Sequence, residues 1–95
     1  MKQIVVFHEE SSSTLTLQYD VYPIASSATL IATGPGGEFK SRHLRLDGHP
    51  SKALMDNVVN SLFELAKPGA KAVVGEEFWD ELEEEFFNKY NAMTF

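Results

Sequence analysis

The first residues in this chain that could do chemistry are a histidine followed by two acids, His8-Glu9-Glu10. Imidazole and carboxylate groups bind zinc when they converge on one point. Successive residues of a strand point to opposite faces, so these three converge only if the chain turns there. The second histidine of a His-Glu-x-x-His motif is missing. We therefore expect no metal site here and no bound cofactor.

Nucleophilic and phosphate-binding chemistry also lacks a motif. The three serines of residues 11–13 are without the glycines of a nucleophile elbow. The glycine-rich turn at residues 34–37 lacks the Lys-Ser/Thr ending of a phosphate-binding loop. His43 and His49 are isolated in sequence, and we expect both at the surface. These patterns favour a protein that is not an enzyme. A small enzyme or ligand-binding protein, with a pocket between sheet and helices, stays open as an alternative.

The strongest pattern is a concentration of charge in residues 75–95. Seven of the 14 acids lie there against one base, Lys89, which gives a net charge of −6; the other residues hold seven acids and seven bases. The segment also contains most of the aromatic residues, which are Phe78, Trp79, Phe86, Phe87, Tyr90 and Phe95. Because charged fields steer partners and aromatic side chains anchor them, this combination is typical of a binding surface.

A helix over residues 76–90, at about 100° per residue, places its apolar side chains in one arc and its acids in the complementary arc. We expect the apolar arc to pack on the core; it contains Phe78, Trp79, Leu82, Phe86, Tyr90 and Met93. Phe87 falls among the acids, so we predict that it is substantially exposed and anchors a partner. The predicted partner-binding residues are Glu77, Asp80, Glu81, Glu83, Glu84 and Phe87.

A second charged cluster, a secondary basic patch, comprises Lys40, Arg42 and Arg45, with His43 beside them. Like charges at i and i+4 in the acidic helix repel by some tenths of a kcal/mol, and a basic surface would offset that repulsion. The offsetting surface is either a partner protein or this basic patch, within one chain or across a homodimer. A solvated face that keeps a small protein soluble is the simpler interpretation of the acids.

Hydrophobic patterns predict the strands that position these residues. The continuous apolar run of residues 4–7 predicts a strand covered on both faces. Strict alternation over residues 14–22 predicts a strand with one buried face, which contains Leu15, Leu17, Tyr19 and Val21. A third strand is expected over residues 28–33, with Leu30 and Ile31 on opposite faces. A fourth covers residues 38–46, and its broken phase predicts a bulge at residues 41–43.

Helical spacing and stop signals complete the fold. Ser51 is a good N-cap for a first helix, and Lys67-Pro68-Gly69 predicts its end. Residues 70–74 are either a linker or a short fifth strand, and the acidic helix follows. We therefore predict one α+β domain over residues 1–95. Its four-stranded antiparallel β-meander is followed by two C-terminal helices packed on one face of the sheet.

Composition limits the function further. The chain has no cysteine, which excludes disulfides and thiolate metal sites. No apolar run approaches the ~20 residues of a membrane span, so we expect a cytoplasmic protein without membrane contact. Its net charge of −6 repels nucleic-acid phosphates, so we expect no direct nucleic-acid binding.

No residue motif identifies a family. In size, acidity and lack of cysteine the chain resembles small phage-encoded inhibitors that mimic DNA or block nucleic-acid-binding proteins, such as anti-restriction and anti-CRISPR proteins; that resemblance rests on size and charge alone. It implies a non-enzymatic protein that inhibits or modulates a partner through its acidic, aromatic C-terminal helix. The partner would present a basic surface, such as that of a nucleic-acid-binding protein. The alternative is a homo-oligomeric structural protein with the acidic helix against a neighbour's basic strand.

Overall fold

The computed structural model describes residues 2–20, 25–48 and 50–92, which form one antiparallel sheet and two helices. The strands are β1 (Lys2–His8), β2 (Ser13–Asp20), β3 (Ala25–Gly34), β4 (Gly37–Lys40) and β5 (Leu44–Asp47); the helices are α1 (Lys52–Val74) and α2 (Trp79–Asn91). Strands β1 to β4 form a meander, β5 also pairs with β3, and both helices contact the sheet. The predicted α+β fold is confirmed.

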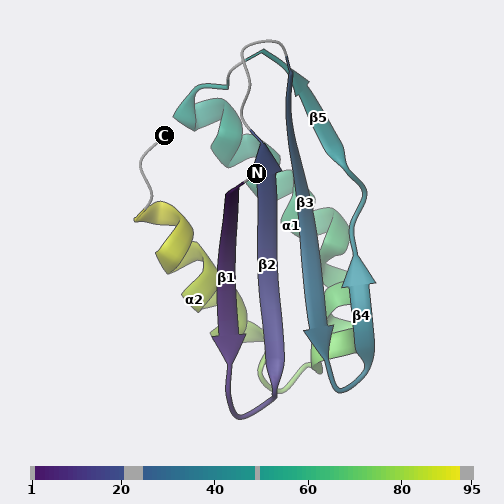
Figure 1. Ribbon diagram of the computed structural model, residues 1–95. Coiled ribbons are helices and arrows are strands. Elements are labelled where there is room, and N and C mark those ends of the chain that lie inside the picture. The colour runs from purple at the N-terminus through teal and green to yellow at the C-terminus, as the bar shows by residue number, and fades with distance from the viewer. Residues whose placement is uncertain (1, 21–24, 49, 93–95) are drawn as a thin grey trace.

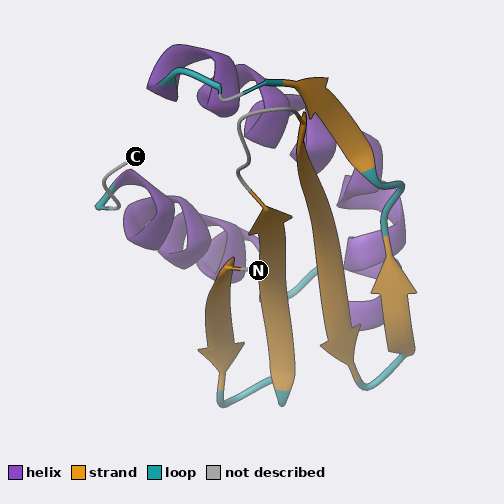
Figure 2. Cartoon of the chain, turned by 45° about the horizontal axis from the view of Figure 1, so that its top comes forward, coloured by secondary structure: helices purple, strands orange, loops and turns teal. Residues whose placement is uncertain are grey.

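Both helices lie on the same face of the sheet. In Figure 1, α2 runs behind β1 at one edge, while α1 crosses behind β3 and the two short strands at the other. Figure 2, tilted by 45°, shows the opposite face without a helix over it. The acidic helix and the basic patch are therefore at opposite edges of the sheet. The alternative in which they pair within one chain is therefore wrong.

The strands differ in how well their pattern predicts burial. In β2, Leu15, Leu17 and Tyr19 are buried as predicted, and the alternate residues are half-buried; Val21 lies outside the described residues. The two-sided burial expected for β1 is wrong, because Val5 and Phe7 are 41% and 58% exposed. Only every second side chain of β1 faces the helices, since neither helix of the described residues lies over the other face of the sheet.

The expected fourth strand is divided in two. The chain leaves the sheet at residues 41–43, where the sequence predicts a bulge, and β4 and β5 pair separately with β3. Ser41 explains the break: its N–H donates to the Leu30 carbonyl at 2.8 Å, and its Oγ accepts the Leu30 N–H at 2.9 Å. One residue thus satisfies both backbone groups of Leu30 and releases the next residues from the ladder.

Helix α1 begins as expected but ends later. Ser51 caps it by accepting the Leu54 N–H at 3.2 Å. The predicted end at Lys67-Pro68-Gly69 is wrong, and residues 70–74 are helical. Gly69 lets the Phe39 ring pack on the helix, where a Cβ would stand 2.3 Å from a ring carbon. This packing, together with the burial of Ala70, Val73 and Val74, outweighs the cost of an internal proline.

The core lies between the sheet and the helices. Trp79, Leu82, Phe86 and Tyr90 are buried there as the helical pattern predicts, Phe78 is half-buried, and Met93 lies outside the described residues. Helix α2 begins at Trp79, later than predicted. Glu76 and Glu77 therefore lie in the connection that precedes it.

Candidate functional site: the acidic face of α2

Burial of the apolar side of α2 directs its acids outward. Because its large apolar side chains are in the core, the exposed acids form an outer surface with those of the preceding connection. We call this surface the acidic face; it consists of Glu76, Glu77, Asp80, Glu81, Glu84 and Glu85, all exposed. Glu83 is half-buried on the flank toward α1, where its Oε2 lies 3.8 Å from the Lys67 Nζ.

The acidic face is poorly neutralised by the chain itself. Among the described residues, Glu81 pairs with His8, and no other acid of the face has a base within ion-pair distance. Lys89, the one base of α2, instead donates to the Val5 carbonyl at 2.7 Å. That bond fastens α2 to the outer edge of β1 and occupies an edge acceptor that another strand could use. The charge concentration seen in the sequence is therefore a surface feature of the fold.

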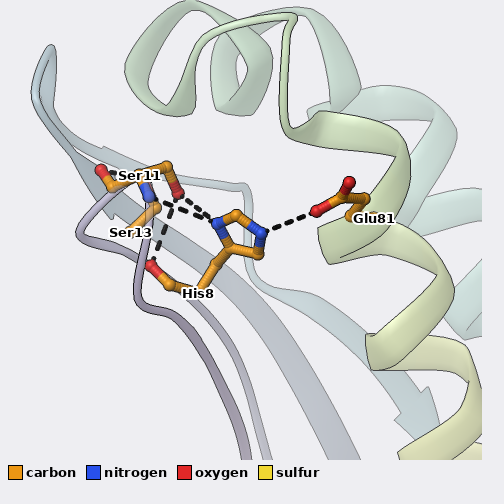
Figure 3. A network of polar contacts seen from close by, with 4 residues as sticks. All are labelled: His8, Ser11, Ser13 and Glu81. Atoms are coloured by element: carbon orange, nitrogen blue, oxygen red, sulfur yellow. Dashed lines mark hydrogen bonds and ion pairs between the residues drawn. The ribbon is translucent and has the colours of Figure 1, made fainter.

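A polar network joins the acidic face to the hairpin between β1 and β2 (Figure 3). The His8 Nδ1 accepts the backbone N–H of Ser11 at 3.3 Å and lies 2.8 Å from the Ser11 Oγ. Since Nδ1 is an acceptor, the ring N–H is at Nε2, and it donates a hydrogen bond to the Glu81 Oε2 at 2.9 Å. Ser13 donates to the Ser11 carbonyl at 3.1 Å, and the His8 ring packs against Phe78 with centroids 5.0 Å apart.

Ser11, His8 and Glu81 have the composition of a hydrolase triad, but their geometry serves attachment. A nucleophilic serine must be open to substrate, and Ser11 is buried. Its own backbone N–H also occupies the ring nitrogen that would take the hydroxyl proton. The network fixes the first turn of α2 against the hairpin. Sequence reasoning missed it because His8 and Glu81 are 73 residues apart.

A second polar cluster fixes the other end of α2. The Tyr90 hydroxyl donates to the Asp56 Oδ1 at 2.8 Å, and the Lys52 ammonium binds the same oxygen and lies 4.7 Å from the Tyr90 ring centroid. Burial and then the hydrogen bond to Asp56 raise the pKa of Tyr90. Hydrogen bonds from Lys52 and Tyr90 lower the pKa of Asp56. Polar contacts thus hold α2 at both ends and fix the position of the helix that carries the acidic face.

The expectation that Phe87 is substantially exposed is wrong. Phe87 is half-buried, with its ring centroid 4.7 Å from that of Phe63 on α1 and 5.3 Å from that of Phe86. A single helical arc does not capture this, because Phe63 of α1 packs against a second side of α2. Phe87 therefore lies on the flank of the acidic face, where its ring contributes to packing between the helices.

The remaining predicted residues lie elsewhere. Lys40, Arg42 and Arg45 are exposed at the far edge of the sheet, where the His43 Nδ1 lies 2.8 Å from the Thr29 Oγ1. His49 lies outside the described residues. Within the described ranges, no three His, Cys, Asp or Glu side chains are grouped to hold a metal ion, and neither helix is long and apolar enough to cross a membrane.

Comparisons with protein-family models, with curated proteins and with solved structures gave no match for this chain.

Proposed function

We propose that this chain is a non-enzymatic binding protein whose acidic face occupies a basic surface of a partner protein and thereby inhibits or modulates it. One observation carries the proposal: the helix is anchored by its apolar side and by polar contacts at both ends, yet most acids of the face have no neutralising base among the described residues. Unpaired carboxylates on a rigid helix are suited to attract a basic surface over distance.

The chemistry of the face favours a nucleic-acid-binding partner. Such proteins neutralise rows of phosphates with lysine and arginine, and a row of exposed carboxylates presents the same sign of charge to those side chains. Because α2 is already ordered, little conformational entropy is lost when it docks. In this proposal the chain acts as a protein mimic of a nucleic acid, like the phage inhibitors it resembles in size and charge, and works in the cytoplasm.

Affinity capture from a bacterial lysate tests the proposal. The wild-type chain is compared with Asp80→Asn/Glu84→Gln/Glu85→Gln, which removes three charges from the acidic face. The matched control Glu9→Gln/Glu10→Gln/Glu38→Gln removes three exposed charges elsewhere. We expect the wild type and the control to retain a nucleic-acid-binding protein that elutes as salt rises, and the α2 variant to lose it. Equal capture by both variants would contradict the proposal.

The separation of charges also favours a second candidate, a head-to-tail homo-oligomer. The acidic face and the basic patch of Lys40, Arg42 and Arg45 lie at opposite edges, so they can meet only between copies. Such a heterologous contact builds rings or open chains. Sedimentation at about 20 mM and about 500 mM salt measures the oligomeric state and tests this candidate. Growth in size at low salt supports the oligomer, and a monomer at both salts rejects it.

A further inference from the structure

A groove lies at the edge of the sheet opposite the acidic face, between β4 and the middle of α1. Its volume is about 310 Å³, and it is lined by Phe39, Lys40, Ser41, Arg42, Leu62 and Leu65. Leu62 is buried and Phe39 is half-buried, which gives the groove an apolar base. Leu65 lies at its rim and is 67% exposed, more than any other large apolar side chain among the described residues.

The walls of the groove are held in place from both sides. The Phe39 ring packs on Gly69 of α1, and at the tip of the β3–β4 hairpin the Gly36 N–H donates to the Val73 carbonyl at 3.0 Å. Ser41 holds the chain to Leu30 where it leaves the sheet, and Arg42 follows outside the ladder. The break between β4 and β5 thus contributes Ser41 and Arg42 to the lining of the groove.

The rim of the groove is basic. Lys40 and Arg42 are exposed, and neither has a salt-bridge partner among the described residues. Glu38 and Glu64 are the acids nearest in sequence, and neither lines the groove. The rim therefore attracts an anionic ligand, while its base accepts an apolar group.

The backbone of β4 adds a third feature. Within the described part of the chain, β4 pairs with β3 alone. In an antiparallel ladder every second residue directs its N–H and C=O away from its neighbour, so β4 presents paired donors and acceptors beside the groove. The β1 edge differs, because Lys89 occupies its Val5 carbonyl. An open strand edge next to a helix is a common docking place for an extended peptide.

We propose that this groove binds an acidic, extended peptide segment of a partner protein. The segment adds to β4 as a further strand, inserts one apolar side chain beside Phe39, Leu62 and Leu65, and places its carboxylates against Lys40 and Arg42. An extended peptide uses the apolar base, the basic rim and the open backbone together, whereas a fatty carboxylate leaves the backbone groups unused. This site is independent of the acidic face, whose partner has the opposite charge.

Titration of the ¹⁵N-labelled chain tests the site. The probe is the blocked peptide acetyl-Glu-Glu-Val-Leu-Val-Glu-Glu-amide, with a version N-methylated at alternate residues and a version with lysine for glutamate. We expect amide shifts in β4 and at Arg42 and Leu65, and at least ~10-fold weaker binding of both altered peptides. Absence of shifts at millimolar peptide, or equal binding of the N-methylated version, overturns the proposal. So does tighter binding of octanoate or of a second copy of the chain at this groove.

Two pairs of variants distinguish binding in the groove from a general effect of charge and from non-specific hydrophobic association. Arg42→Glu should weaken the peptide at least ~10-fold, and Arg45→Glu, exposed on β5 outside the groove, should change it less than ~2-fold. Leu65→Gln should weaken it to a similar degree, and Leu54→Gln, also exposed on α1, should not. Retained amide spectra establish that the variants fold. Equal effects within either pair overturn the proposal.

Discussion

Phe87 stands at the boundary between packing and surface, because its ring contacts Phe63 while its other side reaches the flank of the acidic face. Replacing it with alanine removes a ring contact and part of a buried area, so we expect Phe87→Ala to lower the free energy of unfolding by about 1–2 kcal/mol. Phe86→Ala, at a fully buried ring, should cost about 3–5 kcal/mol. Urea denaturation measures both. Phe7→Ala, at an exposed ring, is the control, and a Phe87 effect as small as that one would contradict the prediction.

Tyr90 and Asp56 make stability depend on pH at both extremes. The pKa of Tyr90 is raised on folding, so its contribution is complete below about pH 10 and is lost as pH rises toward the raised pKa. The pKa of Asp56 is lowered, so its contribution is present above about pH 4 and is lost as pH falls toward the lowered pKa. Tyr90→Phe should reduce the alkaline loss, and Asp56→Asn the acid loss. Burial also raises the pKa of Tyr19, so Tyr90→Phe leaves part of the alkaline loss.

Urea denaturation midpoints measured from about pH 2 to pH 11 test how the stability of each variant changes with pH. At neutral pH, Tyr90→Phe should cost about 1 kcal/mol, the usual value of one hydrogen bond. The prediction fails if the free energy of unfolding of Tyr90→Phe falls with rising alkaline pH as steeply as that of the wild type. The raised pKa of Tyr90 would then make no contribution to stability.

Pro68 and Gly69 are adjacent residues in α1 with opposite expected responses to replacement by alanine. Pro68 is exposed and interrupts the backbone hydrogen bonds of the helix, so Pro68→Ala should raise stability by about 1–3 kcal/mol. A Cβ at Gly69 would meet the Phe39 ring at 2.3 Å, so Gly69→Ala should lower stability although alanine favours helices. Thermal unfolding compares the two. A higher melting temperature for Gly69→Ala would show that Phe39 moves aside freely.

The sequence predicts elements well where burial follows one local period. The alternation of Leu15, Leu17 and Tyr19 in β2 needs only one covered face, and the structure provides it. Pro68 and Gly69 carry the local signals of a helix end, but contact with Phe39, which comes from a distant strand, overrides them. Phe87 was misplaced for the same reason, since its neighbour Phe63 belongs to another helix. Tertiary contacts of this kind leave no periodic trace.

The same distinction applies to the candidate sites. The acids of α2 are contiguous in sequence, so their exposure follows from one helical pattern. The contact of His8 with Glu81 joins distant residues, and the groove brings Phe39 and Arg42 to Leu65 across two elements. The local sequence predicts neither site, because both depend on the fold, which places β1 beside α2 and β4 beside α1.

For the whole molecule, the uneven distribution of charge affects folding itself. Asp80 and Glu84, and likewise Glu81 and Glu85, are like charges at i and i+4, and each such pair destabilises a helix by some tenths of a kcal/mol. The unfolded chain separates these charges and relieves the repulsion. The acidic face is therefore a cost to the isolated fold, which a basic partner would reduce.

Salt should consequently stabilise this protein. Raising the ionic strength from about 0.01 M to about 1 M shortens the Debye length from about 30 Å to about 3 Å, which screens repulsion between exposed acids. We expect a gain of about 1 kcal/mol, which for a domain of this size raises the melting temperature by about 4–8 °C.

Glu84→Gln/Glu85→Gln should melt higher than the wild type at low salt and gain less from added salt. Neither of these two acids lies in the first turn of α2, where the helix dipole would stabilise a negative charge. Glu9→Gln/Glu10→Gln, in the exposed turn between β1 and β2, should keep the full response because those charges lie outside α2. If both double variants respond to salt alike, the repulsion is spread over the molecule and the acidic face does not strain the fold.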